Sequence, residues 1–299
     1  MTGDRRWRCA GLRWSRGSGP VLLWRHPAHG ERTSALTPDR PLAFTTGPGR
    51  HCTGVRRGSR HTPCPDDAEV AASTVSDQCA DCARLDRSYS VAADTRGDDP
   101  RPYDVYLAWF GPGLVKVGIT AAEREGVRLL EQAALSYALL GRGPLMAARR
   151  AEAVLGAALG VPDRFPYAAK RAAREAPPPR ERRAAELGAL HARASGLGGL
   201  PESLALIAFA PVHHDEAFHL ERLRPVQGVV RLAADRTVAG RVEGVAGPDI
   251  HLTASDGRAL LLDGRLLAGR PLGAAAADAE TTAPVEAPAR EPASPEALF

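Results

Sequence analysis

The fold is decided by the sequence YDVYLAWFGPGLVKVGIT, which occupies residues 103–120. Residues 105–110 and 114–119 are two runs of β-branched, aromatic and aliphatic residues, separated by Gly-Pro-Gly. Two such runs joined by a short Gly/Pro turn are typical of a β-hairpin. Gly118 lies inside the second run, where a glycine marks a close backbone approach or a bulge. We therefore predict a β-hairpin whose second strand has either a close backbone approach or a bulge at Gly118.

Two amphipathic helices are predicted after this hairpin. Apolar residues recur at helical spacing between Ala122 and Leu140, and again from Pro144 to Leu159. Proline suits the first turn of a helix, so Pro144 marks the start of the second. Glu152 occupies the one gap in the apolar stripe of that helix, where a carboxylate is costly unless it pairs with an arginine or binds a cation. Both interpretations of Glu152 stay open.

This order of parts resembles the GIY-YIG nuclease superfamily. In that superfamily two triplets on a hairpin each carry a tyrosine, a following helix carries an arginine, and a second helix carries a metal-binding glutamate. The residues at the matching places here are Tyr106 in the first triplet, Lys116 at the start of the second, Arg128 (less favoured, Arg124), and Glu152.

The chain also resembles an uncharacterised prokaryotic family over residues from about 7 to 272. That family combines a Cys-rich segment with the motifs Tyr-Leu-Ala, Lys-Val-Gly-Ile-Thr and Arg-x-x-Glu-Gln-Ala. The last of these matches the sequence RLLEQA at residues 128–133.

The nuclease resemblance implies a metal-dependent phosphodiesterase that acts on DNA or RNA. Glu152 would bind Mg²⁺ or Mn²⁺, and Arg128 would stabilise the developing negative charge. Tyr106 and Lys116 would orient or deprotonate the attacking water. Because Lys116 replaces the second tyrosine of the superfamily, the alternative is a non-catalytic, zinc-stabilised protein that binds DNA or RNA.

A cluster of cysteines precedes the hairpin, within residues 51–90. A Cys-x-x-Cys pair, in which a tight turn lets both thiolates reach one ion, ends the cluster, and clustered cysteines in a cytosolic protein favour zinc over disulfides. We predict a structural zinc ion, because the polar loops around the cluster can bury little apolar area. Disulfides, or a redox pair within the Cys-x-x-Cys motif, are the alternatives, and His51 and His61 are substitute ligands. The predicted ligands are Cys52, Cys64, Cys79 and Cys82, which leaves Cys9 as a small core residue.

Residues 1–50 are predicted to form a small β-unit, with strands at 7–14, 20–24 and 42–44. Trp7 and Trp14 alternate there with Arg5, Arg6 and Arg8, followed by Arg13 and Arg16. Such a mixture can bind single-stranded nucleic acid by charge and stacking. It is more often typical of a solvated strand face with a few core aromatic residues.

The rest of the chain predicts further β-structure and basic helices, giving an α+β protein. The central α/β core spans 103–212, with Arg-rich helices at 163–195 interrupted by prolines and a buried strand at 204–212. Asp-Gly turns between apolar runs predict a β-meander or small barrel at 226–272. Residues 273–299 lack periodicity and predict a disordered tail.

Composition limits the location and the partners. The chain has 299 residues, a net charge of +4 and an isoelectric point near 9.0, which permits nucleic-acid binding without demanding it. It contains no uninterrupted apolar stretch typical of a signal peptide or a membrane span. The sequence therefore predicts a cytoplasmic protein that does not interact with membranes.

Overall fold

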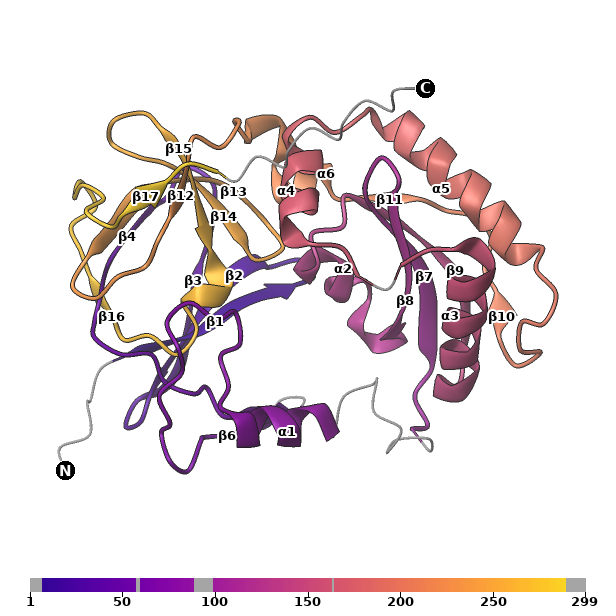
Figure 1. Ribbon diagram of the computed structural model, residues 1–299, viewed down its shortest axis with the longest axis horizontal. Helices are drawn as coiled ribbons and strands as arrows, with labels where there is room; N and C mark the ends of the chain where they lie inside the picture. Colours follow the sequence, from indigo (N-terminus) through magenta and orange to yellow (C-terminus); the bar gives the residue numbers. More distant parts are fainter. Residues whose placement is uncertain (1–6, 58–59, 89–98, 163, 289–299) are drawn as a thin grey trace, which may run out of the picture. The chain divides into compact units, whose positions relative to one another are not determined.

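The computed structural model describes residues 7–57, 60–88, 99–162 and 164–288 (Figure 1). It is a mixed α+β protein, as predicted, and divides into two compact units. The central unit comprises residues 100–129 and 133–215, and the flanking unit comprises residues up to 99, 130–132 and 216–286. In the sequence, most of the central unit is therefore inserted between two parts of the flanking unit.

The central unit is built on the predicted hairpin. Strand β7 (Tyr103–Gly111) pairs antiparallel with β8 (Leu114–Ala121) on one side and with β9 (Ser136–Gly143) on the other. Every residue of β7 is buried, which accounts for its continuous apolar sequence in the middle of the sheet. The strand order is β10-β9-β7-β8, with β11 also paired to β9.

Three longer helices pack against this sheet (Figure 1). Helix α3 (Leu145–Leu159) contacts β7 and β8, α4 (Tyr167–Glu175) contacts β7, and α5 (Arg180–Ser195) contacts β9 and β7. A proline directly precedes each helix, as expected for a residue whose fixed φ suits a helix start and whose missing N–H would have no partner there. The predictions of the helix after Pro144 and of the basic helix pair are confirmed.

The predicted helix from Ala122 to Leu140 is wrong. Only the short η2 (Ala122–Arg124) and α2 (Val127–Glu131) are helical, and the following residues form β9. Ala133 has a φ of 60°, a left-handed conformation that a helix cannot continue through. Strand β9 then gains a full ladder of hydrogen bonds with β7, a long-range interaction that local periodicity cannot reveal.

The predicted buried strand at 204–212 is also wrong in extent. Two two-residue strands, β10 (Ala205–Leu206) and β11 (Val212–His213), pair with β9, and most residues between them are exposed.

Gly118 has a side chain as its close neighbour, rather than the backbone approach or bulge that the sequence predicted. It lies opposite Tyr106 in the β7–β8 ladder, and the ring of Tyr106 covers its Cα. An added Cβ would overlap the tyrosine hydroxyl and would lie 2.5 Å from its Cζ. Tyr106 is only 1% exposed and packs with Ala108, Phe110 and Leu129, so it cannot move aside.

Replacing Gly118 by alanine is expected to reduce the free energy of unfolding by about 1–3 kcal/mol, because the new methyl overpacks a closed core. Urea unfolding would measure this loss. Gly156 in α3 provides a matched control, because its added Cβ would come no closer than 4.0 Å to any atom. Alanine there is expected to stabilise the helix by roughly 0.5–1 kcal/mol. Equal effects at the two glycines would contradict the packing described here.

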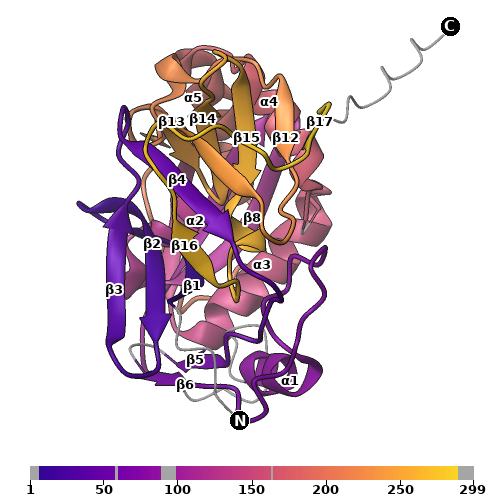
Figure 2. The same ribbon diagram turned by 90° about the vertical axis from the view of Figure 1, so that its left-hand side faces the viewer.

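The flanking unit contains a three-stranded sheet, which Figure 2 shows with β3 at its edge. Its antiparallel strands are β1 (Arg8–Ser15), β2 (Gly19–His26) and β3 (Gly30–Ala35). The first two strands are those predicted from the apolar runs. The third was missed because its residues GERTSA are polar and all exposed.

A seven-stranded sheet makes up most of the remaining flanking unit. Its order is β16-β4-β13-β14-β15-β12-β17, and within the described residues it stays open, so the predicted barrel alternative is not formed. The strands are β4 (Pro41–Thr46), β12 (Gly228–Val230), β13 (Thr237–Ala246), β14 (Asp249–Thr253), β15 (Ala259–Asp263), β16 (Leu272–Ala274) and β17 (Val285–Glu286).

Two predicted assignments change because of this sheet. The run at 42–44 belongs to β4, which pairs with β13 rather than with the N-terminal strands. The predicted disordered tail begins too early, because β17 pairs with β12 and Thr281 exchanges hydrogen bonds with the backbone of Ala239. Residues 289–299 of that tail lie outside the described residues.

The remaining elements of the described chain are short. They are β5 (Val55–Arg57), β6 (Arg60–Thr62), α1 (Ala80–Ser88), α6 (Asp215–Phe218), η3 (Leu220–Arg222) and η4 (Gly264–Leu266). Across the described ranges, no helix combines the length and the apolar character that a membrane crossing requires.

Candidate metal centre

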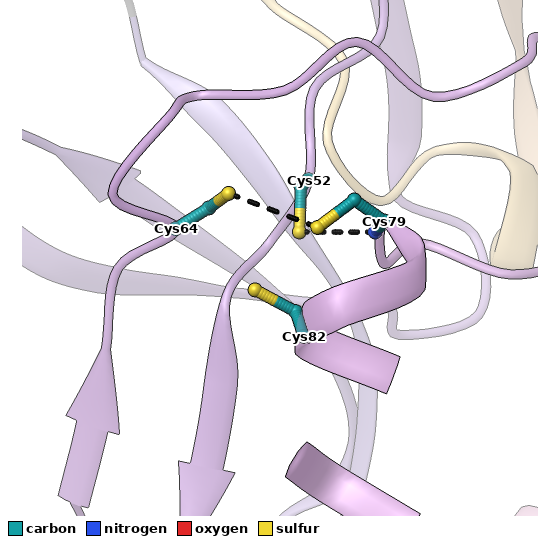
Figure 3. A group of neighbouring side chains, drawn as sticks. All are labelled: Cys52, Cys64, Cys79 and Cys82. Atoms are coloured by element: carbon teal, nitrogen blue, oxygen red, sulfur yellow. Dashed lines mark hydrogen bonds between the residues drawn. The ribbon is translucent and has the colours of Figure 1, made fainter. Parts of the chain in front are cut away.

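The four predicted cysteine ligands converge in the flanking unit (Figure 3). Their sulfur atoms all lie within 4.8 Å of one another, and the sulfurs of Cys64 and Cys79 are 4.0 Å apart. A tetrahedral zinc ion with Zn–S bonds of about 2.3 Å places its sulfurs roughly 3.8 Å apart. The four side chains, which come from the two ends of the β5–β6 hairpin and from the start of α1, could therefore hold one metal ion after small adjustments.

A β-hairpin brings the two widely spaced cysteines together. Cys52 and Cys64 flank the β5–β6 ladder, in which Val55 pairs with Thr62. Gly54 permits the narrow base of this hairpin: its φ is 74°, and an added Cβ would overlap the carbonyl oxygen of Thr62 and lie 2.9 Å from the nitrogen of Cys64. The hairpin thus explains how a separation unlike that of a simple ribbon can still form one site.

The second pair sits at the start of α1. Cys79 and Cys82 occupy one helical turn, closed by a 2.9 Å hydrogen bond from the Ala83 nitrogen to the Cys79 carbonyl. The backbone nitrogen of Cys79 also donates to the Cys52 sulfur at 3.2 Å, and that of Gly54 does so at 3.4 Å. Backbone donors aimed at a sulfur favour its thiolate form, which is the form that binds metal.

The pKa values of these thiols are shifted in different directions. The backbone hydrogen bond from Cys82 is the main cause that lowers the pKa of Cys79. Burial is the main cause that raises the pKa of Cys52 and Cys82. Four thiolates cannot all form so close together without a cation, and a divalent metal supplies the charge that permits it.

The cluster also forms much of its own small core. Cys52 and Cys82 pack with Val55 and Val70, and the other two cysteines pack at the edge of this group. So small an apolar group provides little stability without a metal.

The alternative ligands and pairings are not used in this arrangement. His51 contacts the carbonyl oxygen of Asp67, and His61 contacts that of Thr53, and neither belongs to the convergent group. All five cysteines are free, so the structure contains no disulfide, whereas a redox pair of Cys79 and Cys82 stays a prediction. Cys9 is 1% exposed, and burial raises its pKa to about 12, which confirms it as a core residue.

The residues predicted from the nuclease resemblance lie in the central unit. Tyr106 and Lys116 share one face of the β7–β8 hairpin, because Tyr106 lies opposite Gly118 and Lys116 lies opposite Ala108. Arg128 is exposed on α2, and Glu152 is half-buried on α3. Among the described residues, the four cysteines are the one group of three or more His, Cys, Asp or Glu side chains placed to share a metal. A site for Mg²⁺ or Mn²⁺ at Glu152 stays a prediction.

A stack of aromatic and cationic side chains on the three-stranded sheet was missed by sequence reasoning, apart from Trp7. The ring of Trp7 lies 5.3 Å from that of His26 and 6.4 Å from that of His29, and those two imidazoles stack at 4.4 Å. The guanidinium of Arg32 lies 4.1 Å from the Trp7 ring centroid. The histidines flank the β2–β3 turn and Arg32 lies on β3, the strand that sequence patterning did not reveal.

The other tryptophans of this sheet serve the core. Trp14 is buried, donates to the Gly247 carbonyl at 2.7 Å and meets Phe218 edge-on, and Trp24 is buried and donates to Ser34. Arg5 and Arg6, which the sequence placed in the same basic pattern, lie outside the described residues.

Comparison with known proteins identifies a family but assigns no function. A family model described as "Protein of unknown function (DUF2797)" matches residues 41–269, whereas no curated protein and no solved structure matches the chain. The comparisons give no link to the GIY-YIG nucleases, so that resemblance stays a prediction. Because the match covers well over half of its length, the chain belongs to the DUF2797 family.

Proposed function

We propose that the protein holds a structural zinc ion with Cys52, Cys64, Cys79 and Cys82 and binds single-stranded DNA or RNA on its three-stranded sheet. The observation that supports nucleic-acid binding is the stack formed by Trp7, His26, His29 and Arg32. Base–aromatic stacking combined with nearby cations is the usual way in which proteins hold single strands without reading their sequence.

An exposed charge within the stack suits a phosphate backbone. Arg32 is exposed on β3, and Trp7 is half-buried, which leaves part of its ring accessible. The zinc site stabilises loops that contact this sheet: Arg25 of β2 donates to the carbonyl of Thr53, the residue after the first ligand. The zinc ion thus stabilises the loops beside the sheet, while residues of the sheet contact the nucleic acid.

Replacing Trp7 by alanine is expected to weaken binding of fluorescein-labelled, mixed-sequence single-stranded decamers by about fivefold to a hundredfold, since stacking contributes roughly 1–3 kcal/mol per base. Fluorescence anisotropy with DNA and RNA decamers at several salt concentrations would measure the affinity. Affinity should also fall as salt rises, because phosphate contacts release counterions.

Arg258→Ala is the matched control for this experiment. Arg258 is an exposed arginine of the flanking unit that pairs with Asp256, away from the described stack residues. Its loss should leave affinity almost unchanged. Wild-type protein that binds neither decamer would contradict the proposed function.

A metal-dependent phosphodiesterase is the second candidate function. It is supported by the order of elements and by Tyr106 and Lys116 on one face of the hairpin, with Arg128 and Glu152 on the two helices that flank β9. It ranks second because Tyr106 is 1% exposed and lies in an apolar cluster, where its hydroxyl has little access to substrate.

This candidate predicts that the protein cleaves labelled single- or double-stranded DNA or RNA in the presence of Mg²⁺ or Mn²⁺. Glu152→Ala should abolish cleavage, because the metal-binding carboxylate is lost. Glu175→Ala, at an exposed carboxylate that ends α4, should leave it unchanged. Binding without cleavage, equal in both variants, would reject the phosphodiesterase and leave the binding function in place.

A further inference from the structure

Two buried arginines of the flanking unit line a cavity of about 440 Å³. Arg50 is 1% exposed and Arg270 is 3% exposed. Most of the other walls come from residues 69–72 and 232–234, several of which are exposed, so the cavity is open to solvent. Cavities of about 300–1,000 Å³ with a few convergent polar groups are typical ligand sites. The two guanidinium groups make this cavity a candidate site for an anion.

Both guanidinium groups are bonded to neutral carbonyl groups and not to carboxylates. Arg50 donates to four backbone carbonyl oxygens, those of Ala71, Thr74, Arg265 and Ala268. Arg270 donates to two, those of Leu266 and Ala72. In the described ranges neither side chain forms an ion pair, although a buried charge is costly when no opposite charge compensates it. Both positive charges are therefore available to a bound anion.

Arg270 retains hydrogen-bond donors for a ligand. Its bonds to the two carbonyl oxygens use Nε and Nη2. Nη1, which carries further N–H groups, has no acceptor within the described residues and is not sealed from solvent. The backbone N–H groups of Ala71, Ala72 and residues 232–234 also lack an acceptor in that part of the chain. The walls can therefore donate several hydrogen bonds to one bound group.

Repulsion between the two arginines adds to the cost of burying them. Burial is the main cause that lowers the pKa of Arg270, and the neighbouring charge of Arg50 lowers it further. Glu69 also lines the cavity, but its carboxylate is exposed and forms no ion pair within the described ranges. An anion bound in the cavity would offset both the burial and the repulsion.

We propose that this cavity binds a phosphate group. At pH 7 a phosphate monoester carries about −1.5 to −2 charges and has three acceptor oxygens. It therefore matches the two guanidinium charges and the donors of Nη1, and arginine binds phosphate through pairs of parallel hydrogen bonds. A carboxylate, which is singly charged, would compensate only one of the two arginines. The lining does not include the stack of Trp7, His26, His29 and Arg32, so this site goes beyond the proposed function and does not rest on it.

Isothermal titration calorimetry with inorganic phosphate, at constant ionic strength, tests the site directly. Wild-type protein should bind one phosphate per chain. Glu69→Gln removes a negative charge from the lining and should tighten binding by about fivefold, whereas Ala234→Glu adds one at an exposed wall and should weaken binding by about tenfold. A neutral ligand would not respond to these two substitutions in opposite directions.

Ala277→Glu is the matched control, because it makes the same substitution at an exposed alanine outside the cavity lining. It should bind phosphate as wild type does. Thermal midpoint should stay almost unchanged in all three variants, because each changes an exposed side chain. Wild-type protein that binds no phosphate, equal affinities in Glu69→Gln and Ala234→Glu, or an equal loss in Ala277→Glu would overturn the inference.

Two further titrations identify the source of the phosphate. A 5′-phosphorylated decamer that binds more tightly than the same decamer with a 5′-hydroxyl, by a margin that is lost in Ala234→Glu, would assign the cavity to the end of a nucleic acid. Equal binding of the two decamers, with adenosine monophosphate or inorganic phosphate still bound, would assign it to a free phosphate ligand. Both outcomes support the phosphate site, whereas the Trp7 variant tests the proposed function separately.

Discussion

Replacing Cys79 by serine is expected to abolish zinc binding and to unfold the loops from Cys52 to Cys82. The hydroxyl of serine is a poor ligand for zinc, and the three remaining sulfurs cannot close a tetrahedral structural site. In zinc-finger peptides the metal contributes roughly 10–16 kcal/mol at neutral pH, which is folding free energy for a segment with almost no other core. The apolar group around these cysteines is of that kind, because four of its members are the ligands themselves.

Elemental analysis of the purified protein would measure the metal directly. Wild type should carry one zinc ion per chain, and Cys79→Ser should carry almost none. Hydrogen exchange of peptides that cover residues 50–88 should rise sharply in the variant and in wild type treated with a chelator. Peptides from β7 should change little, because their hydrogen bonds lie within the central unit.

Cys9→Ser is the matched control, because Cys9 is a buried cysteine outside the cluster. It should retain zinc and lose only packing stability. Zinc content that is unchanged in Cys79→Ser, or equally reduced in Cys9→Ser, would show that the cluster is not the metal site.

The sequence predicted the features that depend on neighbouring residues. The hairpin of β7 and β8 follows from two apolar runs and a Gly-Pro-Gly turn, and the convergence of four cysteines follows from a Cys-x-x-Cys pair with two further cysteines. The glycine at position 118 indicated a special site in the strand, but not that a tyrosine side chain packs against it.

The features that sequence analysis missed depend on contacts between distant residues. Residues 122–140 have helical periodicity, but residues 136–143 form β9, because β7 offers them a ladder that is interrupted by a single register shift. Strand β4 pairs with β13, almost 200 residues later in the chain. The aromatic stack went unnoticed because it forms only when β2 and β3 turn back beside Trp7, and the polar sequence of β3 gives no strand signal.

A buried arginine in the central unit carries the second large prediction. Arg183 of α5 is 2% exposed, and its guanidinium donates to Asp215 at 2.5 Å and to the Ser136 hydroxyl at 3.3 Å. Arg183 therefore connects α5 to β9 through Ser136, and to the start of α6 through Asp215. Arg183→Met keeps much of the apolar stem of this side chain but leaves the carboxylate of Asp215 without its main partner.

The expected cost is about 3 kcal/mol of the free energy of unfolding, because, among the described residues, Asp215 then keeps only the more exposed Arg180, at 3.4 Å, as its ionic partner. Urea unfolding, with hydrogen exchange of the α5 peptides, would measure the loss and assign it to the central unit. Arg182→Met changes the exposed neighbour on the same helix and should cost much less. Adding Asp215→Asn to Arg183→Met should recover part of the loss, because the poorly compensated charge disappears.

The pH dependence of the free energy of unfolding tests whether the charge of Asp215 is stabilising. Burial raises the pKa of Asp215, but the hydrogen bond and the charge of Arg183 together lower it by more than burial raises it. The pKa of Asp215 therefore lies below its ordinary value. The wild-type ion pair therefore contributes stability above the unfolded pKa of about 3.9, and loses it as pH falls through the lower folded pKa. In Arg183→Met burial acts without the main opposing partner, so the difference in stability between the two proteins should widen between pH 4 and pH 7. A difference that stayed constant over that range would mean that Arg183 stabilises the fold through packing and its bond to Ser136 rather than through the charge of Asp215.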